Sequence, residues 1–242
     1  MELEKWRNTY PEKFATENVI FGRISRGDTI FIGSACAEPQ HLVQSLIHYV
    51  KSNPKAFCDA EVLHIRSLGV APYATERFKQ HFRHNSFFIG DSTRDAVNHG
   101  VADYTPIFLS QTPKLFDRGM ARVDIALIQT SLPDNLGYVS LGISVDIIKA
   151  AVKRASVVVA QVNRFMPRVH GDSFLNIKDI DYIVPRDESL LEYSPEAESD
   201  IAIRIGKYVA RLVEDGDTIQ VGYGRIPNAV LQHLAGKKHL GV

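Results

Sequence analysis

Cysteine is scarce in this chain, charge of neither sign predominates, and no long apolar run occurs. Cys36 and Cys58 are the only cysteines among 242 residues. They are too few for a disulfide framework or a metal cluster, and their scarcity fits a reducing compartment. The 28 Lys and Arg residues balance 28 Asp and Glu residues, so no surplus of positive charge favours nucleic acid or an anionic membrane surface. No stretch approaches the roughly 18 apolar residues of a membrane span.

The N-terminus lacks the apolar core and small-residue cleavage site of a signal peptide, since MELEKWRNTYPEKF is polar and mixed in charge. We therefore expect a cytoplasmic protein with no nucleic-acid partner and no membrane association. A chain of this length can bury a core large enough to fold without a metal or a disulfide. No metal site is predicted.

Short apolar runs rich in β-branched residues recur along the chain and are typical of buried strands. Predicted helices separate several of them. The signals are helical periodicity over residues 40–51, a helix start at Ser144, and Ser194 with Pro195, which open a long helix reaching about residue 213. This alternation predicts an α/β fold, a mostly parallel open sheet with helices on both faces. The expected strands are Thr29–Gly33, Glu61–Ile65, Phe87–Ile89, Ile107–Leu109, Asp124–Gln129, Val157–Val162, Tyr182–Val184 and Thr218–Gly222.

An internal repeat is the strongest sign of domain organisation. The segment Gly27–Gly33, GDTIFIG, is followed by Pro39, and it recurs 189 residues later as Gly216–Gly222, GDTIQVG, followed by Pro227. In both copies a Gly-Asp turn leads into a strand ending in glycine, and a short loop then brings proline to the first turn of a helix. Chance can match four residues, but the matching strand, loop and helix favour duplication.

The repeat divides the chain unequally. It predicts a first α/β domain over residues 1–190, then a linker helix with the first strand and helix of a similar second domain over residues 191–242. Only 27 residues remain from Gly216 onward. The tail Gly236–Val242 resembles a turn and the start of another strand, which favours a piece of a longer protein over a degenerate second domain.

Open α/β sheets bind ligands in the loops beyond the carboxyl ends of their strands. That rule selects five loops, which are Ser34–Glu38, Ser67–Tyr73, Ser131–Ser144, Asn163–Ser173 and Tyr223–Asn228.

Three of these loops have sequence features that suit a ligand. Asn163–Ser173 carries two arginines, and guanidinium groups suit phosphate or carboxylate; a solvated polar loop is the alternative. Ser131–Gly142 is long for a connection, which indicates function or a packed loop. Gly222–Pro227 has two glycines at a helix start, suiting an anion or tight packing, but it lacks the third glycine of a dinucleotide fingerprint.

Other polar residues favour structural roles. Cys36 is interpreted as a buried thiol, and Glu38 as a first-turn glutamate that stabilises a helix dipole rather than as a catalytic carboxylate. His81 and His84 lack a third ligand at metal spacing and are interpreted as part of a basic surface.

Three motifs, in the right order, resemble the acetyl-CoA hydrolase/transferase family, in which 4-hydroxybutyrate CoA-transferase is found. They are Asp134–Asp146, Val162–Ser173 and Gly222–Val230, and the likeness runs from about Tyr10 to the last residue. The resemblance implies two similar α/β domains with acyl-CoA bound in the cleft between them. It also implies no permanently bound cofactor, with coenzyme A entering as the acyl-CoA substrate and a small carboxylic acid as the second partner. We also expect a homo-oligomer.

In that family a glutamate of the second domain attacks the thioester, a glutamyl-CoA thioester then forms, and an acid or water ends the cycle. That glutamate follows the stretch matching His239–Val242. No catalytic residue is therefore assigned here, this chain alone is expected to be inactive, and the missing domain or a chain carrying it is an expected partner. The residues that the resemblance places against acyl-CoA are Asn163, Met166, Pro167, Arg168, His170 and Gly171 from the first domain, and Gly222, Gly224, Pro227 and Asn228 from the second.

Two other functions stay open. The chain can instead be a non-catalytic acyl-CoA-binding module, and the arginines of Asn163–Ser173 leave a sugar-phosphate isomerase on a related fold as a weaker alternative. The sequence does not separate transferase from hydrolase or identify the acyl group.

Overall fold

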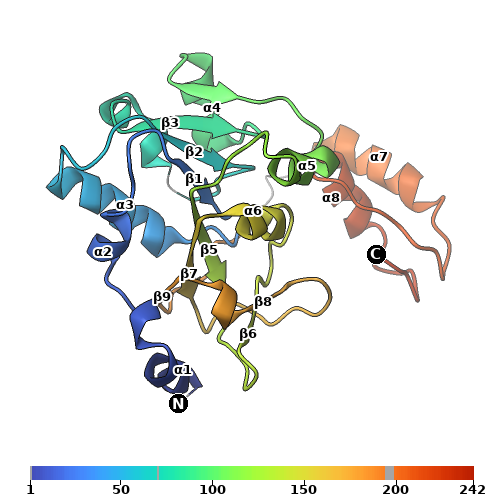
Figure 1. Ribbon diagram of the computed structural model, residues 1–242. Coiled ribbons are helices and arrows are strands. Elements are labelled where there is room, and N and C mark those ends of the chain that lie inside the picture. Colours follow the sequence, from blue (N-terminus) through green and yellow to red (C-terminus); the bar gives the residue numbers. More distant parts are fainter. Residues whose placement is uncertain (1, 70, 194–198) are drawn as a thin grey trace. The chain divides into compact units, whose positions relative to one another are not determined.

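The computed structural model describes residues 2–69, 71–193 and 199–242. They form two compact units, Met1–Glu192 (unit 1) and Tyr193–Val242 (unit 2), and each is described by itself (Figure 1). Among the described residues, no helix has the length and apolar character needed to cross a bilayer.

Unit 1 is built on a seven-stranded sheet in which all neighbouring strands are parallel. The strand order is β4-β3-β2-β1-β5-β7-β9, so the chain enters at the middle of the sheet and builds outward in both directions. The predicted α/β class with a mostly parallel sheet is confirmed. The strands are β1 Thr29–Ile32, β2 Ala60–His64, β3 Phe82–Ser86, β4 Ala102–Tyr104, β5 Ile125–Thr130, β7 Val157–Val162 and β9 Tyr182–Pro185.

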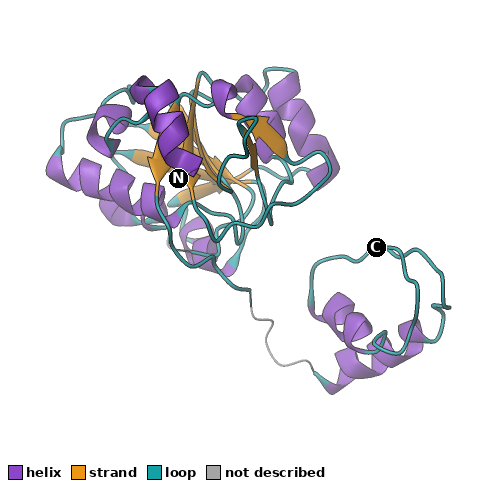
Figure 2. Cartoon of the chain, turned by 90° about the horizontal axis from the view of Figure 1, so that it is seen from below, coloured by secondary structure: helices purple, strands orange, loops and turns teal. Residues whose placement is uncertain are grey.

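Helices cover both faces of this sheet because successive residues of a strand point to opposite sides (Figure 2). In β1, Ile30 packs with Leu46 of α3 (Gln40–Ser52), whereas Phe31 packs in a second cluster with side chains of α6 (Ile148–Arg154). The other helices of unit 1 are α1 Glu2–Thr9, α2 Glu17–Phe21, α4 Asp91–Asn98 and α5 Thr112–Asp117, and its 3-10 helices are η1 Pro11–Lys13, η2 Pro72–Ala74, η3 Glu76–Phe78, η4 Leu109–Gln111 and η5 Ile177–Asp179.

A separate two-stranded sheet joins two of the predicted ligand loops. Strands β6 (Tyr138–Ser140) and β8 (Phe174–Asn176) pair antiparallel, with Val139 opposite Leu175. The loop that follows β5 and the loop that follows β7 are therefore fastened to each other.

Two strands lie elsewhere than predicted. The third and fourth strands are β3 and β4, and neither Phe87–Ile89 nor Ile107–Leu109 is a strand. In β3, whose sequence is FRHNS, the buried positions include the polar residues His84 and Ser86. Hydrophobicity therefore pointed to the apolar residues that follow the strand instead of to the strand itself.

The helix expected directly after Ser144 begins three residues later, at Ile148. The Ser144 hydroxyl donates to the Asp146 carboxylate at 3.2 Å, and Asp146 has a φ of +23°, outside the helical range. The side chain of Ser144 therefore supports a turn instead of capping the helix.

The predicted opening of a helix at Ser194 and Pro195 falls on residues that lie outside the described ones. The described helix α7 runs from Asp200 to Ala210, short of residue 213, and Ser199 caps it by accepting the Ala202 N–H at 3.2 Å. Unit 2 also contains α8, Arg225–Gln232, whose N-cap is Gly224.

The two copies of the repeat have the same turn geometry. Gly27 and Gly216 have φ values of +76° and +87°. The Asp28 carboxylate accepts the Ser25 N–H at 2.8 Å, and the Asp217 carboxylate accepts the N–H three residues earlier in the same way, at 2.7 Å. The two copies of the predicted repeat therefore share this turn in backbone and side chain.

The pairing that follows each turn is also alike. Thr29 of β1 pairs with Glu61 in parallel, and Thr218 forms a parallel bridge with Gly241. The strand predicted over Thr218–Gly222 does not form, since Thr218 alone among these residues takes part in a bridge. Its counterpart β1 has a paired strand on each side. In the tail Gly236–Val242, Gly241 takes part in this isolated bridge and no strand is present.

Candidate functional site

Four of the five predicted ligand loops belong to unit 1 and follow β1, β2, β5 and β7. Since parallel strands end at the same edge of a sheet, these loops gather there.

Asn163, the first residue of the loop after β7, is fully buried and held on all sides. Its Nδ2 donates to Gln129 Oε1 at 2.8 Å and to the Glu188 carbonyl at 2.7 Å, while its Oδ1 accepts the Phe165 N–H at 3.0 Å. Asn163 therefore fixes the path of the loop where it leaves β7.

Two partners in this network were not singled out from the sequence. Gln129 in β5 and Gln161 in β7 are buried, and Gln161 donates to the Glu188 carboxylate at 2.5 Å. The signal that could have found them is a polar residue inside an otherwise apolar buried strand, since such a residue needs a hydrogen-bond partner.

Met166 joins the two motif loops by packing. Its side chain is buried, and a Cβ placed on Gly142 would lie 2.1 Å from the Met166 sulfur. Gly142 also has a φ of +67°, which favours glycine. The adjacent Pro167 is exposed, so the buried methionine anchors an exposed segment.

Arg168 is bonded within unit 1. Its guanidinium donates to the Asp134 carboxylate at 2.6 Å and to the Tyr138 carbonyl at 3.0 Å, and it lies 4.5 Å from the centre of the Phe174 ring. The pKa of Asp134 lies below its usual value. Partial desolvation acts to raise this pKa, but the N–H groups of Tyr138 and Leu136 and the charge of Arg168 lower it by more. Arg168 therefore clamps the loop after β7 to the loop after β5.

We expect a double-mutant cycle of Arg168→Ala and Asp134→Ala to give a coupling free energy of about 1 kcal/mol, because the pair is charge-assisted but partly exposed to solvent. Urea unfolding of the four proteins measures it. Strictly additive effects on stability would contradict the clamp.

The remaining predicted residues of this loop are exposed. His170 meets the Phe174 ring edge to face, with centroids 6.1 Å apart, and Gly171 has a φ of +104°. Several apolar side chains on the same loops are also exposed, and they are Leu136, Tyr138, Ile143, Phe165 and Val169. Unit 1 thus presents apolar and basic groups on the surface of these two loops.

The second predicted set lies at the start of α8 in unit 2. Gly224 is the N-cap with a φ of +141°, and Pro227 lies in the first helical turn, as predicted. The Asn228 N–H donates to the Gly224 carbonyl at 3.1 Å. Gly224 and Pro227 line a hollow of about 430 Å³, while Gly222 is exposed. The first N–H groups of a helix have no partner within it, so this turn can receive an anion.

Glu38 does not have the role expected from the sequence. Its carboxylate accepts the N–H groups of Leu68 and Gly69 in the loop after β2, each at 3.2 Å. Glu188 instead accepts an N–H from the first turn of α3, that of His41, at 3.2 Å. The expectation failed because a residue distant in sequence occupies the helix start.

Two further side-chain expectations were wrong. Cys36 is partly exposed rather than buried. His84 lies buried inside the sheet layer, stacked on His64 with ring centroids 4.5 Å apart, and so is not part of a basic surface.

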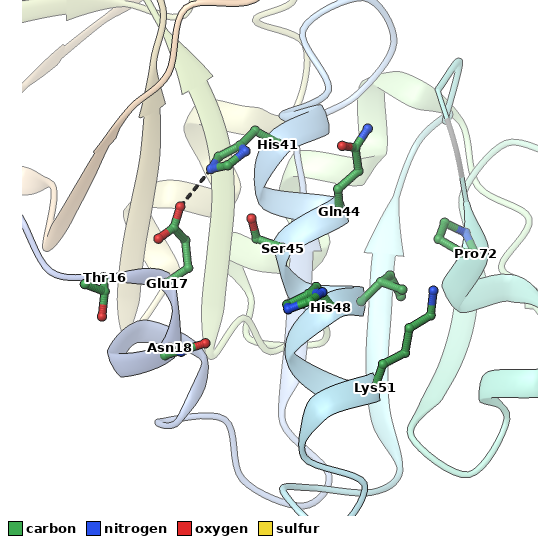
Figure 3. A pocket seen from close by; sticks show the side chains of 10 residues that line it. Thr16, Glu17, Asn18, His41, Gln44, Ser45, His48, Lys51 and Pro72 are labelled. Atoms are coloured by element: carbon green, nitrogen blue, oxygen red, sulfur yellow. Dashed lines mark hydrogen bonds and ion pairs between the residues drawn. The ribbon is translucent and has the colours of Figure 1, made fainter.

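A polar hollow of about 740 Å³ lies along the outer face of α3 (Figure 3). Glu17 and His41 meet there at 2.7 Å, with His48 and Lys51 further along the helix. Its ten lining residues include none of the predicted site residues, so it is separate from the two sets described above.

Known proteins resemble this chain over nearly its whole length. The model of the acetyl-CoA hydrolase/transferase N-terminal domain family matches residues 1–193. The 4-hydroxybutyrate coenzyme A transferase of Clostridium kluyveri is 43% identical over 238 residues, covering 98% of this chain and 54% of that protein. The succinyl-CoA:acetate/propanoyl-CoA:succinate CoA transferase of Fasciola hepatica is 39% identical, covering 96% and 48%. The chain thus spans about half the length of these relatives.

Solved structures agree in fold. The 4-hydroxybutyrate CoA-transferase of Porphyromonas gingivalis matches with a TM-score of 0.79 and 30% identity, covering 98% of this chain and 55% of that one. RipA from Yersinia pestis matches with a TM-score of 0.86 and 26% identity, covering 97% and 56%.

Proposed function

The chain belongs to the acetyl-CoA hydrolase/transferase family, and we propose that it is the N-terminal part of an enzyme that moves CoA from an acyl-CoA to a small carboxylic acid. The observation that carries this proposal is the 43% identity to a CoA-transferase across 98% of the chain. With water in place of the acid, the same chemistry becomes hydrolysis.

The rest of the enzyme is a continuation of the second domain or another chain that carries it. Support comes from the length of the relatives, about twice that of this chain. Support also comes from the repeat, because unit 2 has the same turn, a parallel pairing after it and then a helix, as unit 1 has around β1 and α3.

The proposed chemistry runs through a glutamate of that second domain. Its carboxylate attacks the thioester carbonyl and expels the CoA thiolate, leaving an acyl-glutamyl anhydride. The thiolate then attacks the glutamyl carbonyl, which gives a glutamyl-CoA thioester and releases the acyl group as its carboxylate. The acceptor acid repeats these two steps in reverse. Covalent catalysis of this kind divides one difficult transfer into easier ones.

In this proposal the residues of the chain bind acyl-CoA and support its reacting carbonyl. The loop Asn163–Gly171 offers apolar surface beside guanidinium groups, which suits an acyl chain next to an anionic group. The turn Gly222–Asn228 places two glycines, which have no side chain, at the N-terminus of α8, and such a helix start suits a phosphate oxygen or a developing oxyanion.

Borohydride trapping tests the mechanism in the complete protein. Incubation with acyl-CoA and then borohydride is expected to reduce one glutamyl residue beyond Val242 to an alcohol, which peptide mass spectrometry detects, and omission of acyl-CoA is the control. A protein that turns over with every glutamate unmodified would refute the covalent intermediate.

A further inference from the structure

Glu38 is a buried carboxylate at the carboxyl end of β1, only 1% exposed. Its Oε2 accepts the Ser67 hydroxyl at 2.8 Å, in addition to the N–H groups of Leu68 and Gly69. Burial raises the pKa of Glu38 to about 7, although the bonds from Ser67 and the loop N–H groups act to lower it. Burying a carboxylate costs free energy that an apolar side chain avoids. The contribution of Glu38 to the structure is therefore the set of hydrogen bonds that it accepts from the loop.

The loop that Glu38 holds leaves the sheet at this point. Ala35 and Ser67 still form a parallel bridge, and the Ala35 N–H donates to the Arg66 carbonyl at 2.8 Å. The N–H groups of Leu68 and Gly69 donate to Glu38 instead. A Cβ placed on Gly69 would lie 2.2 Å from the side-chain amide of Gln40, so the loop also packs closely against the start of α3.

Glu38 is connected to the loop after β7 through its backbone. Its carbonyl accepts from Gln129 Nε2 at 3.1 Å, and Gln129 Oε1 in turn accepts from Asn163 at 2.8 Å. One residue therefore ties together two loops at the edge of the sheet where α/β proteins bind their ligands.

We propose that Glu38 is a positioning residue of the CoA-transfer site, holding Ser67–Gly69 in place at the carboxyl edge of the sheet so that the loop is ordered when acyl-CoA binds. Its part in that site rests on the proposed function, whereas its bond to the loop does not. The titratable side chain facing it is Tyr73, whose pKa is raised by burial and by Glu38 itself, with His84 beyond, 5.4 Å from the Tyr73 ring centre.

Amide NMR of this chain tests the bond directly. The amide protons of Leu68 and Gly69 are expected to titrate together with a midpoint near pH 7, and Glu38→Gln is expected to abolish the titration. Glu76→Gln, which removes an exposed glutamate paired with Lys79, is the matched control and leaves the titration intact. Amide shifts of Leu68 and Gly69 that respond to no ionisation at any pH in the wild type, or a titration that persists in Glu38→Gln, overturn the proposal.

Kinetics of the complete protein test the part in the site. Glu38→Ala removes the acceptor, and we expect KM for acyl-CoA to rise roughly tenfold with kcat little changed. Glu38→Gln keeps one acceptor oxygen and is expected to recover most of the loss. An unchanged KM in Glu38→Ala overturns the positioning role. A wild-type enzyme without CoA-transferase activity refutes the proposed function, and the role in that site with it, while the NMR titration still reports whether Glu38 holds the loop.

Discussion

Replacing Gly206 with valine is expected to unfold unit 2 and leave unit 1 intact. Gly206 lies in α7 where α8 crosses it, and a Cβ there would come within 2.7 Å of the backbone carbonyl carbon and oxygen of Ala229. Backbone atoms cannot move aside as a flexible side chain can, so the helices must separate. Overpacking of this kind costs about 3 kcal/mol, which is a large share of the stability of a unit of this size.

Hydrogen exchange followed by mass spectrometry measures this result segment by segment. Peptides covering Asp200–Ala210 and Arg225–Gln232 should lose protection in Gly206→Val, while peptides from β5 and β7 keep theirs. Gly236→Val is the matched control, because a Cβ at Gly236 meets nothing within 4 Å. Retained protection of both helices in Gly206→Val would show that they do not need this close contact.

Replacing His84 with phenylalanine is expected to make the protein progressively more stable relative to the wild type as pH falls. Burial lowers the pKa of His84 from 6.5 to about 4. Below pH 6.5 the His84 side chain is protonated in the unfolded chain, whereas in the native protein it stays neutral down to about pH 4. The free energy of unfolding therefore falls as the pH drops from 6.5 to about 4. At pH 4 the wild type has lost about 3 kcal/mol of stability in this way. The variant has no imidazole at this position and does not lose it.

His64 adds to the same trend. Burial and the neighbouring His84 hold the pKa of His64 well below its ordinary value. Glu38 acts in the opposite sense, since its raised pKa favours the protonated native state between pH 4.5 and about 7. The wild-type curve contains both effects, so the difference between variant and wild type is the quantity to follow.

Urea unfolding at a series of pH values from 8 to roughly 4 gives that difference. Phe82→Leu, in the same strand, changes packing without removing an ionisable group, so its difference from the wild type should stay constant with pH. A difference between His84→Phe and the wild type that is equally constant would mean that burial does not lower the pKa of His84 below its value in the unfolded chain.

The sequence predicted the architecture well where burial and periodicity agree. β5 and β7 are mostly apolar and buried, and α3 carries its apolar residues on one face, so each was found close to its true bounds. β3 was misplaced because His84 and Ser86 occupy its buried positions. Periodicity of hydrophobicity cannot identify a strand whose buried face is polar.

The repeat and the three motifs are what the sequence by itself determined, because a glycine that must adopt a positive φ and an aspartate that must accept a nearby N–H are local requirements. Which side chains meet across the sheet was decided only by the tertiary structure. Glu38 reaches the loop after β2, and Glu188 reaches the start of α3, across about 30 and almost 150 residues of chain. Such contacts depend on strand order and register, which bring distant loops to one edge, and no local pattern records that order.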